Sequence, residues 1–196
     1  ADGTIHDVFY NGLTAAEMHR HYGLARLGIE HVKPIITRGV LIDVAALKGV
    51  ATLPENYEIT VADILAALSR QGMAESSVRQ GDAVLIRSGR STYWNDPGRY
   101  NADSPGIGAE VARWLAGKQV ALVGDDGVGG EVDSRTTPNV ANPVHIELVT
   151  KNGIFLVENM ALDGLATDRA YEFLFIFTPL ALRGATGSAG RPIAIR

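Results

Sequence analysis

Apolar residues along this chain follow two patterns that alternate with one another. Some stretches are short runs of apolar and β-branched residues, which predict buried strands, and others repeat an apolar residue every three or four positions, which predicts amphipathic helices. Two helices begin with capping-box spacing, in which a Thr precedes an acidic residue by three positions, at Thr14 and Thr60. We predict strands at 38–47, 82–89, 119–124, 154–158 and 171–182, and helices from 14 to about 22 and over 61–72, 110–118 and 143–153.

The order of these elements indicates an α/β fold, because strands and helices alternate along the chain. The helix at 143–153 has the usual asymmetry of helix ends, with Asn142 as its expected cap, Pro143 at its first position and Gly153 just after its end. The glycine-rich segment 183–192 is predicted to be a loop. We find no repeat or linker, and therefore predict one domain over residues 1–196, with a mixed central sheet and helices packed outside it.

Composition and charge narrow the possible partners. The net charge of −4 and the pI of about 5.7 argue against nucleic acid as a partner and favour a small molecule. The chain has no Cys, so any metal ion would need His and carboxylate ligands. The sequence contains no run of about 18 apolar residues that could span a membrane, and no signal peptide, so we expect a cytoplasmic protein.

Two glycine-rich segments invite a comparison with phosphate-binding loops. The segment 124–131, GDDGVGGE, lacks the Lys-Ser/Thr ending of a P-loop and places two Asp residues where an anion would bind, so we interpret it as a turn. The segment 183–191 carries Arg183 and Arg191 and could bind an anion, but a structural loop is the interpretation that we favour.

One histidine has an unusual position. His145 falls in the first turn of its predicted helix, and Glu158 ends the strand that follows. Strand carboxyl ends and helix amino ends meet at one edge of an α/β sheet, so these residues could converge with the opening pair Asp2 and His6. The alternative, favoured by the local pattern alone, is that His145 only packs and Glu158 is an isolated carboxylate. The other histidines lie in polar surroundings and are interpreted as solvated: His19, His21 and His31.

Six stretches in order along the chain give it a family resemblance. They are HDVFYNG at 6–12, TRGVLIDVAALKGV at 37–50, GDAVLIRSG at 81–89, PGIGAEVARWLA at 105–116, PVHIELVTKNGIFLVEN at 143–159 and LRGATGSAGRPIAI at 182–195. On these stretches the chain resembles the metal-dependent cyclase family of hydrolases, which includes kynurenine formamidases and isatin hydrolases. The resemblance implies a swivelling β/β/α fold.

The opening residues resemble the second half of the signature of that family. The signature reads His, Gly, Thr, His, any residue, Asp, three residues, His, and Asp2 and His6 have its Asp-to-His spacing. The resemblance implies that Asp2 bridges two metal ions, that His6 is the acid/base catalyst, and that His145 and Glu158 bind the second metal. We expect the chain to lack the N-terminal portion of the family domain, with both earlier histidines, and a chain that starts at Ala1 should therefore bind metal weakly.

The resemblance implies hydrolysis of a non-peptide C–N bond, in an aryl formamide or a cyclic amide, by water that a divalent zinc or manganese ion activates. Two alternatives stay open: an inactive chain of the same fold that binds a small molecule or supports an assembly, and a lactone hydrolase or cyclase. We also expect a homo-oligomer, a dimer or tetramer, because the strand edges left without the N-terminal portion would pair with another chain.

Overall fold

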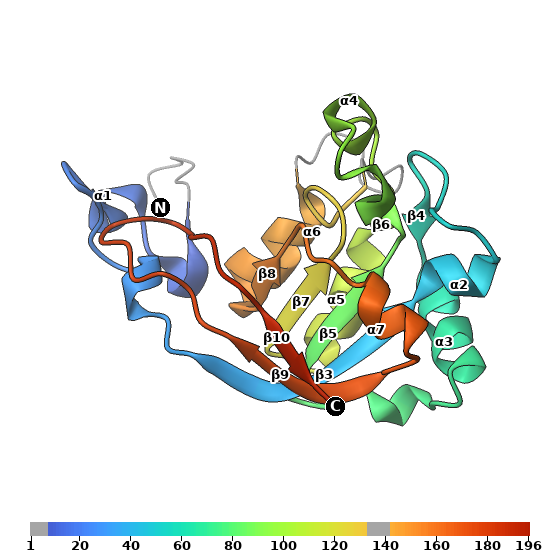
Figure 1. Ribbon diagram of the computed structural model, residues 1–196. Helices are drawn as coiled ribbons and strands as arrows, with labels where there is room; N and C mark the ends of the chain where they lie inside the picture. Colours follow the sequence, from blue (N-terminus) through green and yellow to red (C-terminus); the bar gives the residue numbers. More distant parts are fainter. Residues whose placement is uncertain (1–7, 133–141) are drawn as a thin grey trace.

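Six strands form the central sheet of the computed structural model, which describes residues 8–132 and 142–196 (Figure 1). Four neighbouring strands run parallel to one another, and the last two pair antiparallel at one side. The predicted α/β class with a mixed central sheet is thus confirmed. In spatial order the strands are β10 (Ile193–Ile195), β9 (Glu172–Phe177), β3 (Ile35–Asp43), β5 (Ala83–Arg87), β7 (Leu122–Asp125) and β8 (Phe155–Val157).

Helices and two small sheets complete the described part of the chain. None of its helices has the length and apolar character that crossing a membrane would need. The small sheets pair β1 (His19–Arg20) with β2 (Gly23–Leu24) and β4 (Glu58–Ile59) with β6 (Gly106–Ile107). The α-helices are α1 (Ala15–Met18), α2 (Val44–Lys48), α3 (Val61–Arg70), α4 (Pro97–Tyr100), α5 (Ala109–Gly117), α6 (Pro143–His145) and α7 (Asp163–Thr167). A π-helix, η5, follows α6 at Ile146–Lys151. Short 3-10 helices lie at Tyr10–Gly12, Ile29–His31, Glu75–Ser77 and Arg90–Tyr93.

The sheet separates two hydrophobic cores. On one face, residues of β3, β5 and β7 pack against α3, α5 and η5, with Ile64, Leu115 and Leu148 fully buried. On the other face, Phe173 and Phe175 pack with residues of β5 and the segment that leads into α7. Burial of this much apolar surface is the main source of stability for such a fold.

The predicted strand at 38–47 continues too far. It ends at Asp43, and residues 44–48 form α2, because the Asp43 carboxylate accepts a hydrogen bond from Ala46 N at 2.9 Å and thereby caps a helix. Gly49 then ends that helix in the left-handed conformation, with φ of 69°. The predicted helix at 61–72 is α3, and its Thr60 capping box is present.

The helix predicted at 143–153 is present with a different start. Asn142 has φ of 52° and its side chain caps nothing. Instead the Glu131 carboxylate accepts a hydrogen bond from Val144 N at 2.7 Å. Glu131, 13 residues before Val144 in the sequence, thus accepts the hydrogen bond from a first-turn N–H that Asn142 was expected to accept. The second part of this helix is the π-helix η5.

The loop predicted at 183–192 connects the central sheet to the N-terminal segment. Figure 1 shows it extending from β9 and β10 toward α1. Leu24 N donates to Gly184 O at 2.8 Å, and Gly184 N donates to a Glu30 carboxylate oxygen at 2.9 Å. The preceding strand prediction, 171–182, was too long, because β9 ends at Phe177. The helix predicted from Thr14 was also too long, because α1 ends at Met18 and β1 follows.

Candidate functional site

The carboxyl ends of the parallel strands meet at one edge of the sheet, where two acidic residues lie side by side. Gly124 of β7 pairs with Val157 of β8, so Asp125 and Glu158, one residue later on each strand, are neighbours. Val123, two residues before Asp125, belongs to the core beneath α3 and α5. Because side chains alternate between the faces of a strand, both carboxylates point to that face.

His145 lies between two carboxylates at this edge. Its Nδ1 is 2.6 Å from a Glu131 oxygen, and its Nε2 is 3.5 Å from a Glu158 oxygen. The other Glu131 oxygen accepts the hydrogen bond from Val144 N, so Glu131 is fixed to the first turn of the helix that carries His145. The Nδ1–H of the imidazole is therefore directed to Glu131, and Nε2 is the nitrogen that faces Glu158.

The two carboxylates stabilise the protonated imidazole. Hydrogen bonds to Glu131 and Glu158 raise the pKa of His145 from 6.5 to about 9, although burial opposes them. The same contact lowers the pKa of the Glu158 carboxyl below its ordinary value. In the absence of a metal ion, His145 is thus a cation at neutral pH, and any ion bound at Nε2 must displace its proton.

Two further acids behave differently because desolvation dominates their surroundings: Asp126 is fully buried and Asp125 is partly buried. Burial raises the pKa of the Asp125 carboxyl well above its ordinary range, and the charges of Asp126 and Glu158 raise it further, while a hydrogen bond of 2.7 Å from Gly127 N opposes the rise. Burial also raises the pKa of Asp126. The Asp126 carboxylate accepts hydrogen bonds from Ser88 N, Ser88 Oγ and Gly89 N at 2.7–2.8 Å, and these bonds tie the end of β5 to the end of β7.

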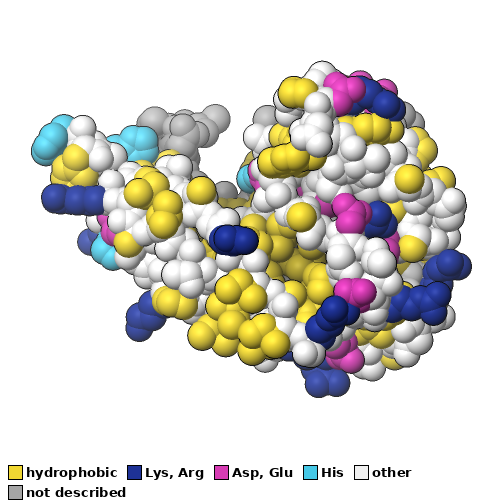
Figure 2. Space-filling view, in the orientation of Figure 1, with side chains coloured by type: hydrophobic (Ala, Val, Ile, Leu, Met, Phe, Trp, Pro, Cys, Tyr) yellow, Lys and Arg dark blue, Asp and Glu magenta, His cyan; other side chains and the backbone are white. Residues whose placement is uncertain are grey.

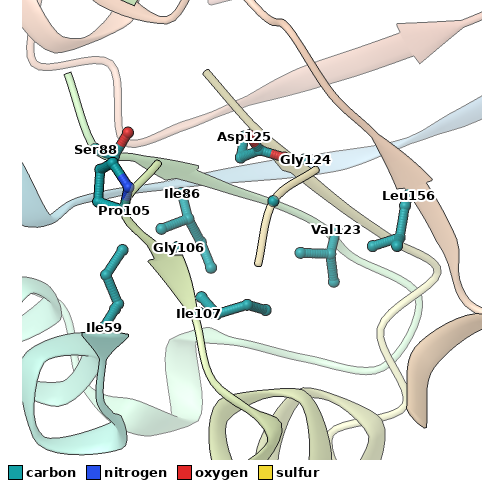
Figure 3. Close-up of a pocket in the computed structure, with 11 residues that line it drawn as sticks. Ile59, Ile86, Ser88, Pro105, Gly106, Ile107, Val123, Gly124, Asp125 and Leu156 are labelled. Carbon is teal, nitrogen blue, oxygen red and sulfur yellow. The ribbon is translucent and has the colours of Figure 1, made fainter. Parts of the chain in front are cut away.

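A pocket opens beside these carboxylates, between the central sheet and the β4–β6 pair (Figure 3). Its walls are mostly aliphatic. Ser88 and Asp125 are the residues with polar side chains among those that line it. The lining residues are Ile59, Ile86, Ser88, Pro105, Gly106, Ile107, Val123, Gly124, Asp125, Gly130 and Leu156.

Tyr100 connects the segment around α4 to the same edge. Its hydroxyl donates to Asn159 Oδ1 at 2.8 Å, and Asn159 follows Glu158 directly in the sequence. Burial raises the pKa of this hydroxyl to about 12, so it is neutral at physiological pH. The fully buried Arg90 donates to the carbonyl oxygens of Arg99, Tyr100 and Ala102, and thereby fixes the conformation of this segment.

The predicted site residues divide into two groups. Asp2 and His6 lie outside the described residues. His145 and Glu158 do come together, as their contact of 3.5 Å shows, while their role as metal ligands stays a prediction. Within residues 8–132 and 142–196, no group of three or more acidic or imidazole side chains is placed to bind a metal ion.

Glu131 is a residue of this cluster that the sequence pattern did not identify. It ends the glycine-rich segment 124–131, which we interpreted only as a turn at the sheet edge. The sequence signal that could have identified Glu131 was its position directly after the glycines of this segment. Its partner His145 is 14 residues away, beyond a segment whose path the sequence does not define.

The chain was compared with known families and structures. Residues 13–132 match the family described as "Putative cyclase". A crystal structure of a protein described as a novel cyclase is 35% identical over 99% of this chain and 66% of that one, with a TM-score of 0.85. Proteins with curated descriptions gave no match.

Two more distant structures share the fold. Isatin hydrolase A from Ralstonia solanacearum is 21% identical over 86% of this chain and 64% of that one, with a TM-score of 0.67. A protein from Bacillus stearothermophilus, described as a predicted metal-dependent hydrolase, is 20% identical over 82% and 63%, with a TM-score of 0.54. The chain thus spans 63–66% of the length of these three proteins. By the family match and the 35% identity to the novel cyclase, the chain belongs to the cyclase family.

Proposed function

We propose that this chain is the catalytic part of a metal-dependent hydrolase that cleaves a non-peptide C–N bond in an aryl formamide or a cyclic amide. The observation that carries the proposal is the orientation of His145, with Nδ1 against Glu131 and Nε2 toward Glu158. Histidines that bind metal ions usually donate their other ring N–H to a carboxylate, which fixes the tautomer and the ring orientation.

The donor set fits a divalent zinc or manganese ion in its chemistry. An imidazole nitrogen and a carboxylate oxygen are ligands that both ions accept. His145 and Glu158 would bind the ion, and Glu131 would orient His145. Two ligands do not complete a site, because zinc ions in catalytic sites generally have three protein ligands. Asp2 is the further ligand that we propose, with His6 as the acid/base group.

The chemistry that such an ion supplies in hydrolases is the acidification of water and the polarisation of a carbonyl group. The residues of the chain contribute the rest. The aliphatic side chains that line the pocket would pack against the substrate and exclude water from it. Glu131 would keep the proton of His145 on Nδ1, and His6 would transfer a proton to the departing nitrogen.

The test measures metal content and turnover together. A version of the chain that carries His-Gly-Thr-His directly before Ala1, which restores the family signature, should bind zinc or manganese stoichiometrically by elemental analysis and hydrolyse isatin or formylkynurenine. His145→Ala and Glu158→Gln should lose most of the bound metal and at least about tenfold in turnover. Glu147→Gln, which changes an acid on the same helical segment that pairs with Lys151, should retain both. Full turnover in His145→Ala, or no metal in the extended chain, would refute the proposal.

A further inference from the structure

The turn that follows Glu158 has an unfavourable backbone conformation. Asn159 lies in the left-handed region, with φ of 60°. This region is disfavoured for residues with a side chain, although Asn tolerates it better than most. Such conformations persist only where the surrounding structure holds them, and they are common at functional sites. Asn159 therefore needs contacts that keep it in this conformation.

The pairing of the strands ends before Glu158. The last pair of β7 and β8 joins Gly124 to Val157, one residue before Glu158. The backbone is held again at the next residue, where Asn159 N donates to Gly127 O at 3.0 Å. The direction of the Glu158 side chain therefore depends on the turn at Asn159 as well as on β8.

Tyr100 holds the side chain of Asn159. Its hydroxyl donates to Asn159 Oδ1 at 2.8 Å and lies 3.4 Å from Asp126 O, so its one proton is directed to the closer acceptor. Tyr100 is only 6% exposed and is fixed from two sides. Its ring packs edge-on against Trp94, with 5.4 Å between the ring centroids, and Arg90 Nε donates to its carbonyl oxygen at 3.3 Å. A firmly placed donor thus meets the side chain of the residue in the left-handed conformation.

We propose that Tyr100 is a positioning residue for Glu158. Its hydrogen bond keeps Asn159 in the left-handed conformation, and the turn thereby directs the Glu158 carboxylate to His145 Nε2. Tyr100 acts through Asn159 and contacts neither the metal ion nor the substrate. The assignment rests on the proposed function, since it takes Glu158 as a metal ligand whose direction matters. Removing a group that orients a metal ligand typically weakens metal binding by about 10- to 100-fold.

Two single variants test the role in the metal-free chain. Tyr100→Phe removes the hydroxyl and keeps the ring that packs against Trp94. In its crystal structure, residue 159 should leave the left-handed region, and Glu158 Oε1 should lie more than about 4 Å from His145 Nε2, beyond the limit of an ion pair. Asn159→Ala removes the acceptor and disfavours the left-handed conformation, so it should have the same effect, and it decides the matter if Tyr100→Phe does not fold.

A second substitution at position 159 provides a rescue. Asn159→Gly also removes the acceptor, but glycine adopts positive φ without strain, and the backbone bond to Gly127 O stays available. The double variant of Tyr100→Phe and Asn159→Gly should therefore restore both the turn and the contact of Glu158 with His145. A hydroxyl that only stabilised the fold would not be replaced by this change.

Zinc affinity gives a second readout, in the chain that carries His-Gly-Thr-His before Ala1. Competition with a chromophoric chelator should show about tenfold weaker binding in Tyr100→Phe and in Asn159→Ala, and an affinity close to that of the wild type in the double variant. Tyr93→Phe is the matched control. It removes a hydroxyl that accepts a hydrogen bond from Arg99 Nη2 at 2.6 Å, and it should alter neither readout.

The assignment is wrong if Glu158 keeps its contact with His145 in Tyr100→Phe and in Asn159→Ala, or if zinc affinity does not follow that contact. A double variant that behaves like Tyr100→Phe alone would also overturn it, because the hydroxyl would then not act through Asn159. The two proposals fail separately. An extended chain that binds no zinc contradicts the proposed function, while the metal-free crystal structures still decide the role of Tyr100. A chain that binds zinc and hydrolyses isatin, with Glu158 facing His145 in every variant, contradicts the role of Tyr100 alone.

Discussion

At the scale of single residues, the site depends on which ring nitrogen of His145 is paired with which carboxylate. The family resemblance pointed to His145 and Glu158, and the alternation of strands and helices placed them at one sheet edge. Neither indicated that Nδ1 would be paired with Glu131 at 2.6 Å. Such a contact joins residues 14 positions apart in the sequence, and no local pattern of hydrophobic and polar positions encodes it. Residues that orient a ligand are therefore harder to predict than the ligand itself.

The first prediction concerns the charge of His145. Glu131→Gln removes the carboxylate that makes the larger contribution to the raised imidazole pKa, so the pKa should fall from about 9 toward its ordinary value of 6.5. An NMR titration of the imidazole protons in metal-free protein measures the change. Glu147→Gln is the matched control and should leave the pKa unchanged. An unchanged pKa in Glu131→Gln would show that Glu158 alone sets it.

The same pairing makes the stability of the metal-free protein depend on pH. Because the pKa of His145 is higher in the folded chain than its ordinary value, the stabilisation is fully present below about pH 6.5 and is lost as the pH rises to about 9. Urea unfolding at a series of pH values should therefore show a decline over this window. Glu131→Gln should flatten that decline, and an equally steep decline in the variant would contradict the explanation.

At the scale of elements, the sequence predicted which elements exist more accurately than where they end. The positions of β3, β5, β7, α3 and α5 followed from apolar periodicity and the Thr60 capping box. The end of β3 did not, because residues 38–47 are apolar or β-branched almost throughout and suit either a strand or a buried helix. The Asp43 side chain sets the boundary between β3 and α2, because one of its carboxylate oxygens caps the helix.

The second prediction tests this boundary. Asp43 accepts from Ala46 N and also pairs with Arg87 Nη1 at 3.0 Å. Asp43→Asn keeps a capping oxygen and loses the charge, and should lower the free energy of unfolding by about 1 kcal/mol. Asp43→Ala loses both contacts and should cost about 2–3 kcal/mol, as measured by urea denaturation.

A second cap provides the control for that experiment. Asp96 accepts from Arg99 N at 3.2 Å at the start of α4, but its contact is exposed. Asp96→Ala should therefore cost only about 0.5–1 kcal/mol. If Asp43→Ala costs no more than Asp96→Ala, then the cap at Asp43 and its pairing with Arg87 do not define the end of β3.

At the scale of the whole molecule, the antiparallel side of the sheet carries an apolar surface that the described residues leave uncovered. Ile193 pairs with Ile176 and Ile195 pairs with Leu174, so these side chains fall on neighbouring strands in two rows. Ile193 and Ile195 are each 51% exposed and Leu174 is 42% exposed. Figure 2 shows hydrophobic side chains gathered on the surface in the region of β9 and β10. Surfaces of this kind commonly mark contacts between proteins.

The third prediction is self-association through this surface. In the described part of the chain β10 is an edge strand, and its unpaired backbone groups together with Ile193 and Ile195 would favour pairing with a second copy. Light scattering should give a mass that rises with concentration toward that of a dimer or tetramer. The double variant Ile193→Lys and Ile195→Lys should shift the protein to a monomer, since buried charges without partners oppose association.

Val149→Lys, at an exposed apolar position of η5 away from this edge, should leave the association unchanged. A wild-type chain that stays monomeric at every concentration would contradict the prediction, and so would an association that the double variant does not weaken.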